Sequence, residues 1–302
     1  MSRALVLRPS AKINLRLRVG PVREDGFHAV TTVLQSIALS DTLTLTSRRG
    51  PFALDTRAPG VPADRTNLVW RAADLLWRAL GRTGEPRDVH VKLEKQIPSA
   101  AGLGGGSADA AAALAGLNRL WTGHQSRRDL LRLAATLGAD VPFFLVGGTA
   151  IGVGRGDEVY PLDDARRLGV IIIKPSFGVA TADAYRWLDE DRSGPVSVIT
   201  EDSSELDLGW SHGPLQVTND LQGSVTSRHP EIGQILQALA DAGARAAAMS
   251  GSGSAVFGVF SEASGPRAAR QLKKLTKLMR PDWLVLLTRT LTRREAARRG
   301  GL

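Results

Sequence analysis

The sequence predicts an α+β protein, and three observations support this prediction. Alternating apolar and polar residues predict strands at 4–19 and 88–93, whereas apolar residues at helical spacing predict a helix at 67–80. The two patterns do not follow each other in the regular order of a doubly wound parallel sheet. Because 302 residues exceed what one core usually holds, we expect two domains, 1–165 and 166–302.

The first domain is expected to begin with a half-buried strand at 4–19. The alternation there places Lys12 and Asn14 side by side on one face. The other elements expected in this domain are, in chain order, two strands within 29–46, the helix 67–80, the strand 88–93, a helix ending near Trp121, a helix from about Arg127 to Leu137 with Gly138 at its C-terminal cap, and strands and turns at 143–162.

The second domain is expected to begin with a buried strand, because residues 169–174 form a continuous apolar run. Residues 191–214 are rich in Ser, Gly, Pro and Asp, which predicts a surface loop. The remaining elements expected are helices at about 231–242 and 266–279 and strands at 255–260 and 283–289. The end of the chain is expected to be a solvated, partly frayed tail that contains Arg289, Arg293, Arg294, Arg298 and Arg299.

The composition excludes several classes of protein. The absence of cysteine excludes disulfides and cysteine–metal sites, and five scattered histidines without an HExxH motif argue against zinc. No apolar run approaches the roughly 18–20 residues of a membrane span, and a signal-peptide pattern is missing. We therefore expect a cytoplasmic protein with no membrane partner. The net charge of +9 suits anionic partners, but aromatic residues are only 5%, so nucleic acid is not an expected partner.

The stretch IPSAAGLGGGSADAAAAL, residues 97–114, predicts a phosphate-binding loop ahead of a helix. Backbone without Cβ atoms can turn its N–H groups toward an anion. The loop lacks the lysine of a Walker motif and the third glycine of a dinucleotide fingerprint. Ser107 could cap the helix, contact phosphate or bind Mg²⁺, and the alternative is a simple glycine turn capped by Ser107. The loop itself consists of Gly102, Leu103, Gly104, Gly105 and Gly106.

A second glycine-rich run, MSGSGSAVFGVF at 249–260, precedes an apolar strand. It contains Gly251, Ser252 and Gly253. Two such loops in two domains indicate a cleft with phosphate groups on both sides. The alternative is a turn that only leads into the strand.

Phosphoryl transfer needs a phosphate cradle, a cation and a group that orients or deprotonates the attacking hydroxyl. Asp140, in GADVPFF, is the candidate base, and the alternative is that it only caps a short helix. Lys12 could keep Asp140 ionised and stabilise developing charge. A lysine on a half-exposed strand is otherwise most often a solvated charge.

Four motifs, in this order, resemble the superfamily of galactokinase, homoserine kinase, mevalonate kinase and phosphomevalonate kinase. They are SAKINL (10–15), IPSAAGLGGGSADAA (97–111), GADVPFF (138–144) and MSGSGSAVF (249–257). REDGFH (23–28) and NDL (219–221) resemble the branch that acts in non-mevalonate isoprenoid biosynthesis. The resemblance implies a first domain like ribosomal protein S5 domain 2, a ferredoxin-like second domain, and an active site in the cleft between them.

The resemblance also implies an activity and its residues. The implied reaction is ATP-dependent phosphorylation, with Mg²⁺, of the 2-hydroxyl of 4-diphosphocytidyl-2-C-methyl-D-erythritol, a small molecule that carries cytidine diphosphate. The implied catalytic pair is Lys12 and Asp140. The implied nucleotide contacts are Asn67, Lys95 and the loop Gly102 to Ser107, and the implied substrate contacts are Asn14, Phe27, His28, Tyr185, Gly251, Ser252 and Gly253.

One residue departs from the family pattern. Phe27 stands where the family usually has tyrosine, so we expect stacking without the hydroxyl contact. His28 is expected to hydrogen-bond the cytosine edge. Two alternatives stay open, a superfamily kinase of another alcohol such as homoserine or mevalonate, and a non-catalytic RNA-binding protein. A monomer and a homodimer are both compatible with the sequence.

Overall fold

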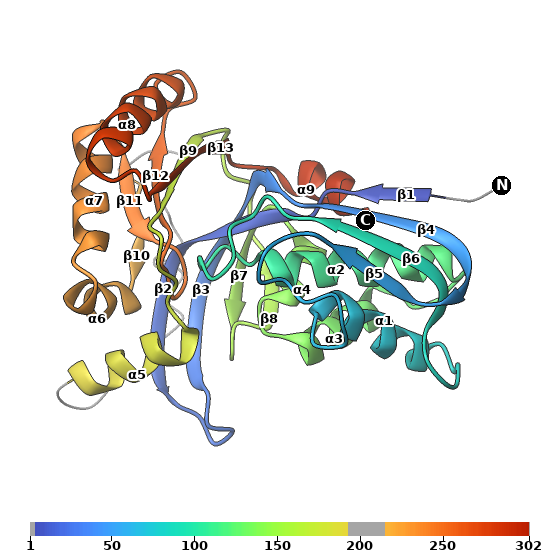
Figure 1. Cartoon of the computed structure of the whole chain (residues 1–302). Helices are drawn as coiled ribbons and strands as arrows, with labels where there is room; N and C mark the ends of the chain where they lie inside the picture. Colours follow the sequence, from blue (N-terminus) through green and yellow to red (C-terminus); the bar gives the residue numbers. More distant parts are fainter. Residues whose placement is uncertain (1–3, 193–214, 302) are drawn as a thin grey trace.

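Three β-sheets form the framework of the protein, which is described by a computed structural model over residues 4–192 and 215–301 (Figure 1). The first sheet contains β1 (Ala4–Leu7), β4 (Thr42–Pro51), β6 (Arg87–Glu94) and β5 (Ala53–Thr56), in that order. The second contains β10 (Thr218–Asn219), β2 (Ser10–Val22), β3 (His28–Ser40), β7 (Thr149–Val153) and β8 (Glu158–Pro161). The third contains β11 (Ala246–Met249), β12 (Val256–Phe260), β9 (Gly169–Lys174) and β13 (Leu284–Arg289).

Helices pack beside these sheets in two groups. Those in the first half are α1 (Leu68–Ala79), α2 (Gly105–Leu120), α3 (Arg127–Leu137) and α4 (Val141–Val146). Those that follow are α5 (Thr181–Asp191), α6 (Leu221–Arg228), α7 (Glu231–Asp241), α8 (Gly265–Met279) and α9 (Arg293–Gly300). The α+β prediction is confirmed, since most strand pairs are antiparallel and β5–β6 and β10–β2 are parallel. None of the helices within the described ranges is both long and apolar enough to cross a membrane.

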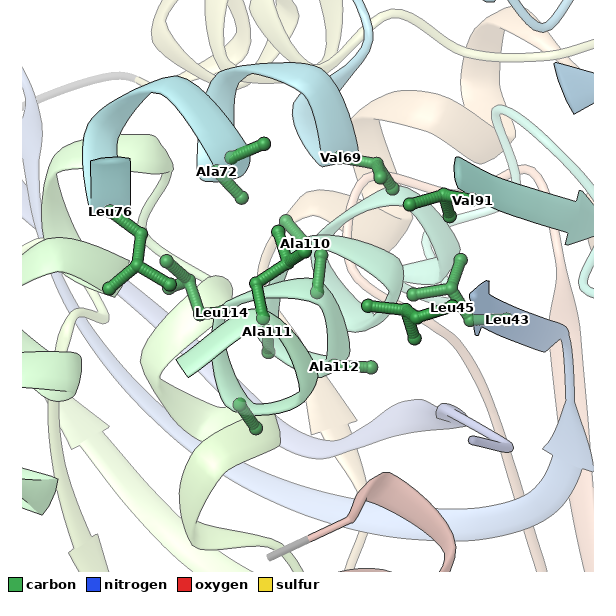
Figure 2. Close-up of a cluster of buried hydrophobic side chains, with 14 of the residues drawn as sticks. Leu43, Leu45, Val69, Ala72, Leu76, Val91, Ala110, Ala111, Ala112 and Leu114 are labelled. Atoms are coloured by element: carbon green, nitrogen blue, oxygen red, sulfur yellow. The ribbon is translucent and has the colours of Figure 1, made fainter. Parts of the chain in front are cut away.

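Helix α2 lies at the centre of the first-half core. Its buried residues Ala110, Ala111 and Leu114 pack between α1 and the strands that carry Leu45 and Val91 (Figure 2). Alanine side chains let helices approach closely, and a close-packed interior resists displacement. The packing therefore holds the N-terminal end of α2, where the first glycine loop ends, in a defined place.

The expectation of one half-buried strand at 4–19 is wrong in two respects. The chain leaves the first sheet after Leu7 and enters the second at Ser10. Strand β2 is buried on both faces, because Ile13 packs in a core shared with β9 and β12, while Lys12 lies beneath the glycine loops. The backbone N–H of Lys12 donates to the Leu103 carbonyl at 3.0 Å.

Short and marginal elements also differ from the predictions. Residues 141–146 form helix α4 rather than a strand, since Pro142 is compatible with the first helical turn. Helices α5 and α6 and strands β5, β10 and β11 were not expected. Of the predicted loop 191–214, only Asp191, the last residue of α5, and Arg192 are described, and the rest lies outside the described residues.

The arginine-rich end is also corrected, because it is not a frayed tail. Thr292 and Glu295 form a capping box that starts α9, and Glu295 also pairs with Arg289 and Arg167. Arg293 donates to the backbone carbonyls of Thr149 and Leu162, at 3.2 and 2.6 Å. The Arg299 guanidinium likewise donates to the Ala38 carbonyl at 3.1 Å. These arginines bind buried and half-buried carbonyls of the first half, which is why the segment is ordered.

We expect Glu295→Gln to destabilise the fold in a pH-dependent way. Hydrogen bonds from Arg289, with help from Thr292 and Arg167 against the opposing effect of burial, lower the pKa of Glu295 to about 2. A lowered pKa stabilises the native state above the unfolded value of 4.5, and this stability disappears as pH falls toward 2. The substitution should cost about 1 kcal/mol at pH 7 and progressively less below pH 4.5, as measured by urea unfolding.

The matched control is Glu262→Gln, since Glu262 is exposed and makes no hydrogen bond or ion pair within the described residues. An equal loss in both variants at pH 7 would contradict the role given to Glu295.

Candidate active site

A cleft of about 1200 Å³ is lined by both glycine loops. Its walls come from β2, the start of α2, the loop before β12, and helix α5. The structure brings to it every residue predicted for the site, namely Lys12, Asn14, Phe27, His28, Asn67, Lys95, Gly102 to Ser107, Asp140, Tyr185, Gly251, Ser252 and Gly253. Their individual roles stay predictions.

The first glycine loop is shaped by positions where a side chain does not fit. Gly104 has a positive φ of 72°, and a Cβ there would lie 2.6 Å from the Phe144 ring. Gly104 is also the N-terminal cap of α2, so the alternative in which Ser107 caps the helix is wrong. Ser107 instead lies in the first turn and lines the cleft, and its hydroxyl makes no hydrogen bond within the described chain. The hydroxyl is therefore available to a ligand.

The second glycine loop rests directly on the first. The Ser250 hydroxyl donates to the Gly102 carbonyl at 3.0 Å, and a Cβ on Gly102 would collide with the Ser250 carbonyl oxygen. Asn219, from the NDL motif, donates to the carbonyls of Met249 and Gly251, both at 2.8 Å. The second glycine loop leads into β12, which agrees with the alternative of a turn before the strand. It also forms one wall of the cleft, which a simple turn would not explain.

Lys12 and Asp140 form an ion pair on the cleft floor. Lys12 Nζ lies 3.4 Å from Asp140 Oδ2, and the side chains are 4% and 42% exposed. Lys12 also donates to Asn14 Oδ1 at 2.6 Å, while the Asn14 amide donates to Thr32 at 2.8 Å. Asp140 occupies the N-terminal cap position of α4 but makes no capping bond with its side chain. Its carboxylate faces Lys12 and the cleft instead.

Lys95 lies beneath the first glycine loop with its charge already paired. Its ammonium contacts Asp41 and lies 2.7 Å from Asp109, and all three side chains are at most 10% exposed. Asp41 also accepts the backbone N–H groups of Gln96 and Ile97. Lys95 lines the cleft, but in this arrangement it supports the loop more directly than it faces a nucleotide.

One ammonium cannot neutralise two buried carboxylates, and the pKa values reflect this. Burial lowers the pKa of Lys95, but Asp109 and Asp41 outweigh it and the net shift is upward. Burial, reinforced by Asp41 against the opposing effect of Lys95, raises the pKa of Asp109 to about 8. Asp109 Oδ1 has no hydrogen-bond partner among the described residues. It is therefore the oxygen that can carry a proton at neutral pH.

The other end of the cleft is aromatic. The ring centroids of His28 and Tyr185 are 5.2 Å apart and stacked, and Phe27 is 57% exposed with Arg155 5.5 Å from its ring centroid. Burial and, second, the Asp140 carboxylate raise the pKa of Tyr185 to about 12. The Asp140 carboxylate is thus within electrostatic reach of the aromatic end.

The sequence did not predict several residues that line the cleft or lie beneath it. Asp109 had a signal, because it is the lone carboxylate in a run of alanines and a charge there had to be buried. Asp41 lies between the two strands expected within 29–46 and had no signal of its own. Asp189 lies on α5, a helix that was not expected, and it had no signal of its own.

A phosphate-type loop that lies in one cleft with a paired lysine and carboxylate defines the class of phosphotransferases. Comparison with known families agrees. Residues 67–148 match the GHMP kinases N terminal domain, and residues 205–277 match the GHMP kinases C terminal model.

Individual relatives narrow the match. A 4-diphosphocytidyl-2-C-methyl-D-erythritol kinase from Moorella thermoacetica is 42% identical over 95% of this chain and 99% of its own length. One from Pelotomaculum thermopropionicum is 40% identical over 94% and 97%. A crystal structure of 4-(cytidine 5'-diphospho)-2C-methyl-D-erythritol kinase superposes with a TM-score of 0.74 at 33% identity, covering 96% of this chain and 99% of that one. The chain therefore belongs to the GHMP kinase family, where it groups with these kinases.

A homoserine kinase from Cytophaga hutchinsonii superposes with a TM-score of 0.69 at 19% identity, covering 96% of this chain and 95% of that one. This likeness concerns the fold alone.

We expect Asp109→Asn to change how stability depends on pH. Native Asp109 keeps its proton up to about pH 8, whereas the unfolded side chain loses it near 3.8. Between these values the native state binds more protons than the unfolded chain, so the contribution of Asp109 to stability falls as pH rises. From pH 5 to pH 9, wild type should lose stability relative to Asp109→Asn by more than about 1 kcal/mol in denaturant titrations. A constant difference between the two proteins across this range would contradict the assignment.

Proposed function

We propose that this chain catalyses the ATP-dependent phosphorylation of the 2-hydroxyl of 4-diphosphocytidyl-2-C-methyl-D-erythritol. The observation that carries the proposal is the Lys12–Asp140 pair. It lies in one cleft with a phosphate-type glycine loop and an aromatic end on which a nucleobase can stack. The relatives at about 40% identity over nearly the whole chain are kinases named for this substrate.

In the proposed reaction, Asp140 accepts the proton of the substrate hydroxyl. The hydroxyl oxygen forms a bond to the γ-phosphorus of ATP, and the bond from that phosphorus to the β–γ bridging oxygen breaks, which releases ADP. Lys12 holds Asp140 in place and stabilises negative charge as it develops on the transferring group. Because Lys12 is buried and also bound to Asn14, its ammonium is fixed before the substrate arrives.

The first glycine loop is the proposed cradle for the triphosphate of ATP. The backbone of Gly102 to Gly106 meets the start of the 16-residue helix α2, whose dipole favours anions. Mg²⁺ usually keeps several waters and binds through few protein ligands plus substrate phosphates. The Ser107 hydroxyl fits as one such ligand, and the described residues contain no cluster of three or more metal-binding side chains that would suggest a separate cage. When bound, Mg²⁺ neutralises phosphate charge.

The cytidine end is proposed to lie between Phe27 and Tyr185, beside His28. The Phe27 ring has no hydroxyl group, so its contact with the cytosine ring would be stacking alone. We further propose that the enzyme works in the cytoplasm. We also propose that Asn67 lies at the end of the cleft that binds ATP. There the Asn67 side chain caps α1 through Val69 N–H and donates to the Pro62 carbonyl.

Asp140→Asn tests the proposed base. The amide keeps the shape of the side chain but cannot accept the proton, so kcat should fall by about 100-fold or more while KM changes little. Coupled detection of ADP measures both constants. Asp163→Asn, an exposed carboxylate away from the cleft, should behave like wild type. Retained turnover in Asp140→Asn would remove Asp140 from this role.

The substrate is tested by offering alternative alcohols. With ATP and Mg²⁺, the protein should release ADP in the presence of 4-diphosphocytidyl-2-C-methyl-D-erythritol, and free CDP should compete with that substrate. Homoserine or mevalonate should give no ADP above background. ADP release with either of these, together with indifference to CDP, would favour a superfamily kinase of another alcohol.

A further inference from the structure

The aromatic end of the cleft contains one carboxylate that the proposed reaction does not use. Asp189 lies near the end of α5 and lines the cleft together with Phe27 and Tyr185. Its side chain is 48% exposed. In Figure 1, α5 lies beside the β2–β3 hairpin, the element from which Phe27 and His28 come.

Asp189 determines how the His28 ring is held. His28 Nε2 lies 3.1 Å from Asp189 Oδ2, and Nδ1 lies 3.1 Å from the Gly20 carbonyl oxygen. Both ring nitrogens therefore already face an oxygen of the protein, the Gly20 carbonyl on one side and the Asp189 carboxylate on the other. The ring is further fixed by its stack on Tyr185. His28 alone therefore has no free nitrogen with which to read a base edge.

The second oxygen of Asp189 is free to make that contact. Oδ1 makes no hydrogen bond within residues 4–192 and 215–301. The nearby cation on the same helix, Arg186, is bound to Asp183 and Glu190, at 3.0 and 2.8 Å. The carboxylate of Asp189 thus presents an unshared acceptor at the aromatic end of the cleft.

We propose that Asp189 selects cytosine over uracil at the nucleoside end of the substrate, an inference that rests on the proposed function. Its Oδ2 keeps His28 in place, and its Oδ1 accepts a hydrogen bond from the 4-amino group of the base.

The chemistry of the two bases gives this carboxylate its selectivity. Cytosine carries an amino donor at C4, to which Asp and Glu are suited as acceptors. Uracil carries a carbonyl oxygen at C4. That oxygen and Asp189 Oδ1 are both acceptors, so they cannot form a hydrogen bond with each other. A correctly matched base contact discriminates by about 10- to 100-fold.

The test compares CDP and UDP binding to the full chain by calorimetry, with a non-hydrolysable ATP analogue occupying the other nucleotide site. Wild type should prefer CDP by about 10- to 100-fold. In Asp189→Asn the amide can turn its NH₂ toward the uracil oxygen, so the preference should shrink to about threefold or less. Asp189→Ala should weaken CDP binding by about tenfold.

Asp183→Asn is the matched control, because Asp183 is a similarly exposed carboxylate of α5 that pairs with Arg186 instead of His28. It should keep the wild-type preference, and all variants should bind the ATP analogue equally. A wild-type preference in Asp189→Asn would overturn the inference and leave the proposed function intact. Failure of wild type to bind CDP at all would overturn the proposed function itself.

Discussion

The structure depends on the direct contact between two glycine-rich backbones. Gly102 leaves no room for a side chain against Ser250, and the Ala255 N–H donates to the Ala101 carbonyl at 3.2 Å. This contact joins the phosphate-type loop of the first half to the loop that leads into β12. Two backbones can approach this closely only where Cβ atoms are missing. The glycines therefore build the wall of the cleft as well as the space for an anion.

Paired charges are arranged in two groups around these loops. Lys12 has one carboxylate partner, Asp140, and an amide partner, Asn14, which leaves the pair balanced. Lys95 has two carboxylate partners, and this imbalance goes with the raised pKa of the buried Asp109. The first group faces the cleft, where it can contact a bound ligand. The second lies beneath the loop and holds its position, since a buried charge without partners would be costly.

The sequence was informative where the chemistry is local. Neighbouring residues alone predicted a phosphate-binding loop in the glycine run, a shared strand face for Lys12 and Asn14, and a candidate base in Asp140. The structure brings these residues together in one cleft. The Lys95 cluster was not predicted, because its carboxylates come from separate elements and only tertiary packing unites them. Helix α4 was expected only in the alternative in which Asp140 caps a short helix, because six residues are too few to display a helical period. The order of α9 was missed because its arginines bind carbonyls that are distant in sequence.

The docking of α9 affects the order in which the molecule can be assembled. The Arg8 N–H donates to the Arg299 carbonyl, and a Cβ on Gly301 would meet Leu7, so the C-terminal end of the described chain lies against the end of β1 (Figure 1). Strand β1 and the carbonyls that bind Arg293 belong to the first half of the chain. During synthesis this half emerges from the ribosome early, yet its packing stays incomplete until residues 291–301 have followed. The first half of the chain is thus finished last, although it is translated first.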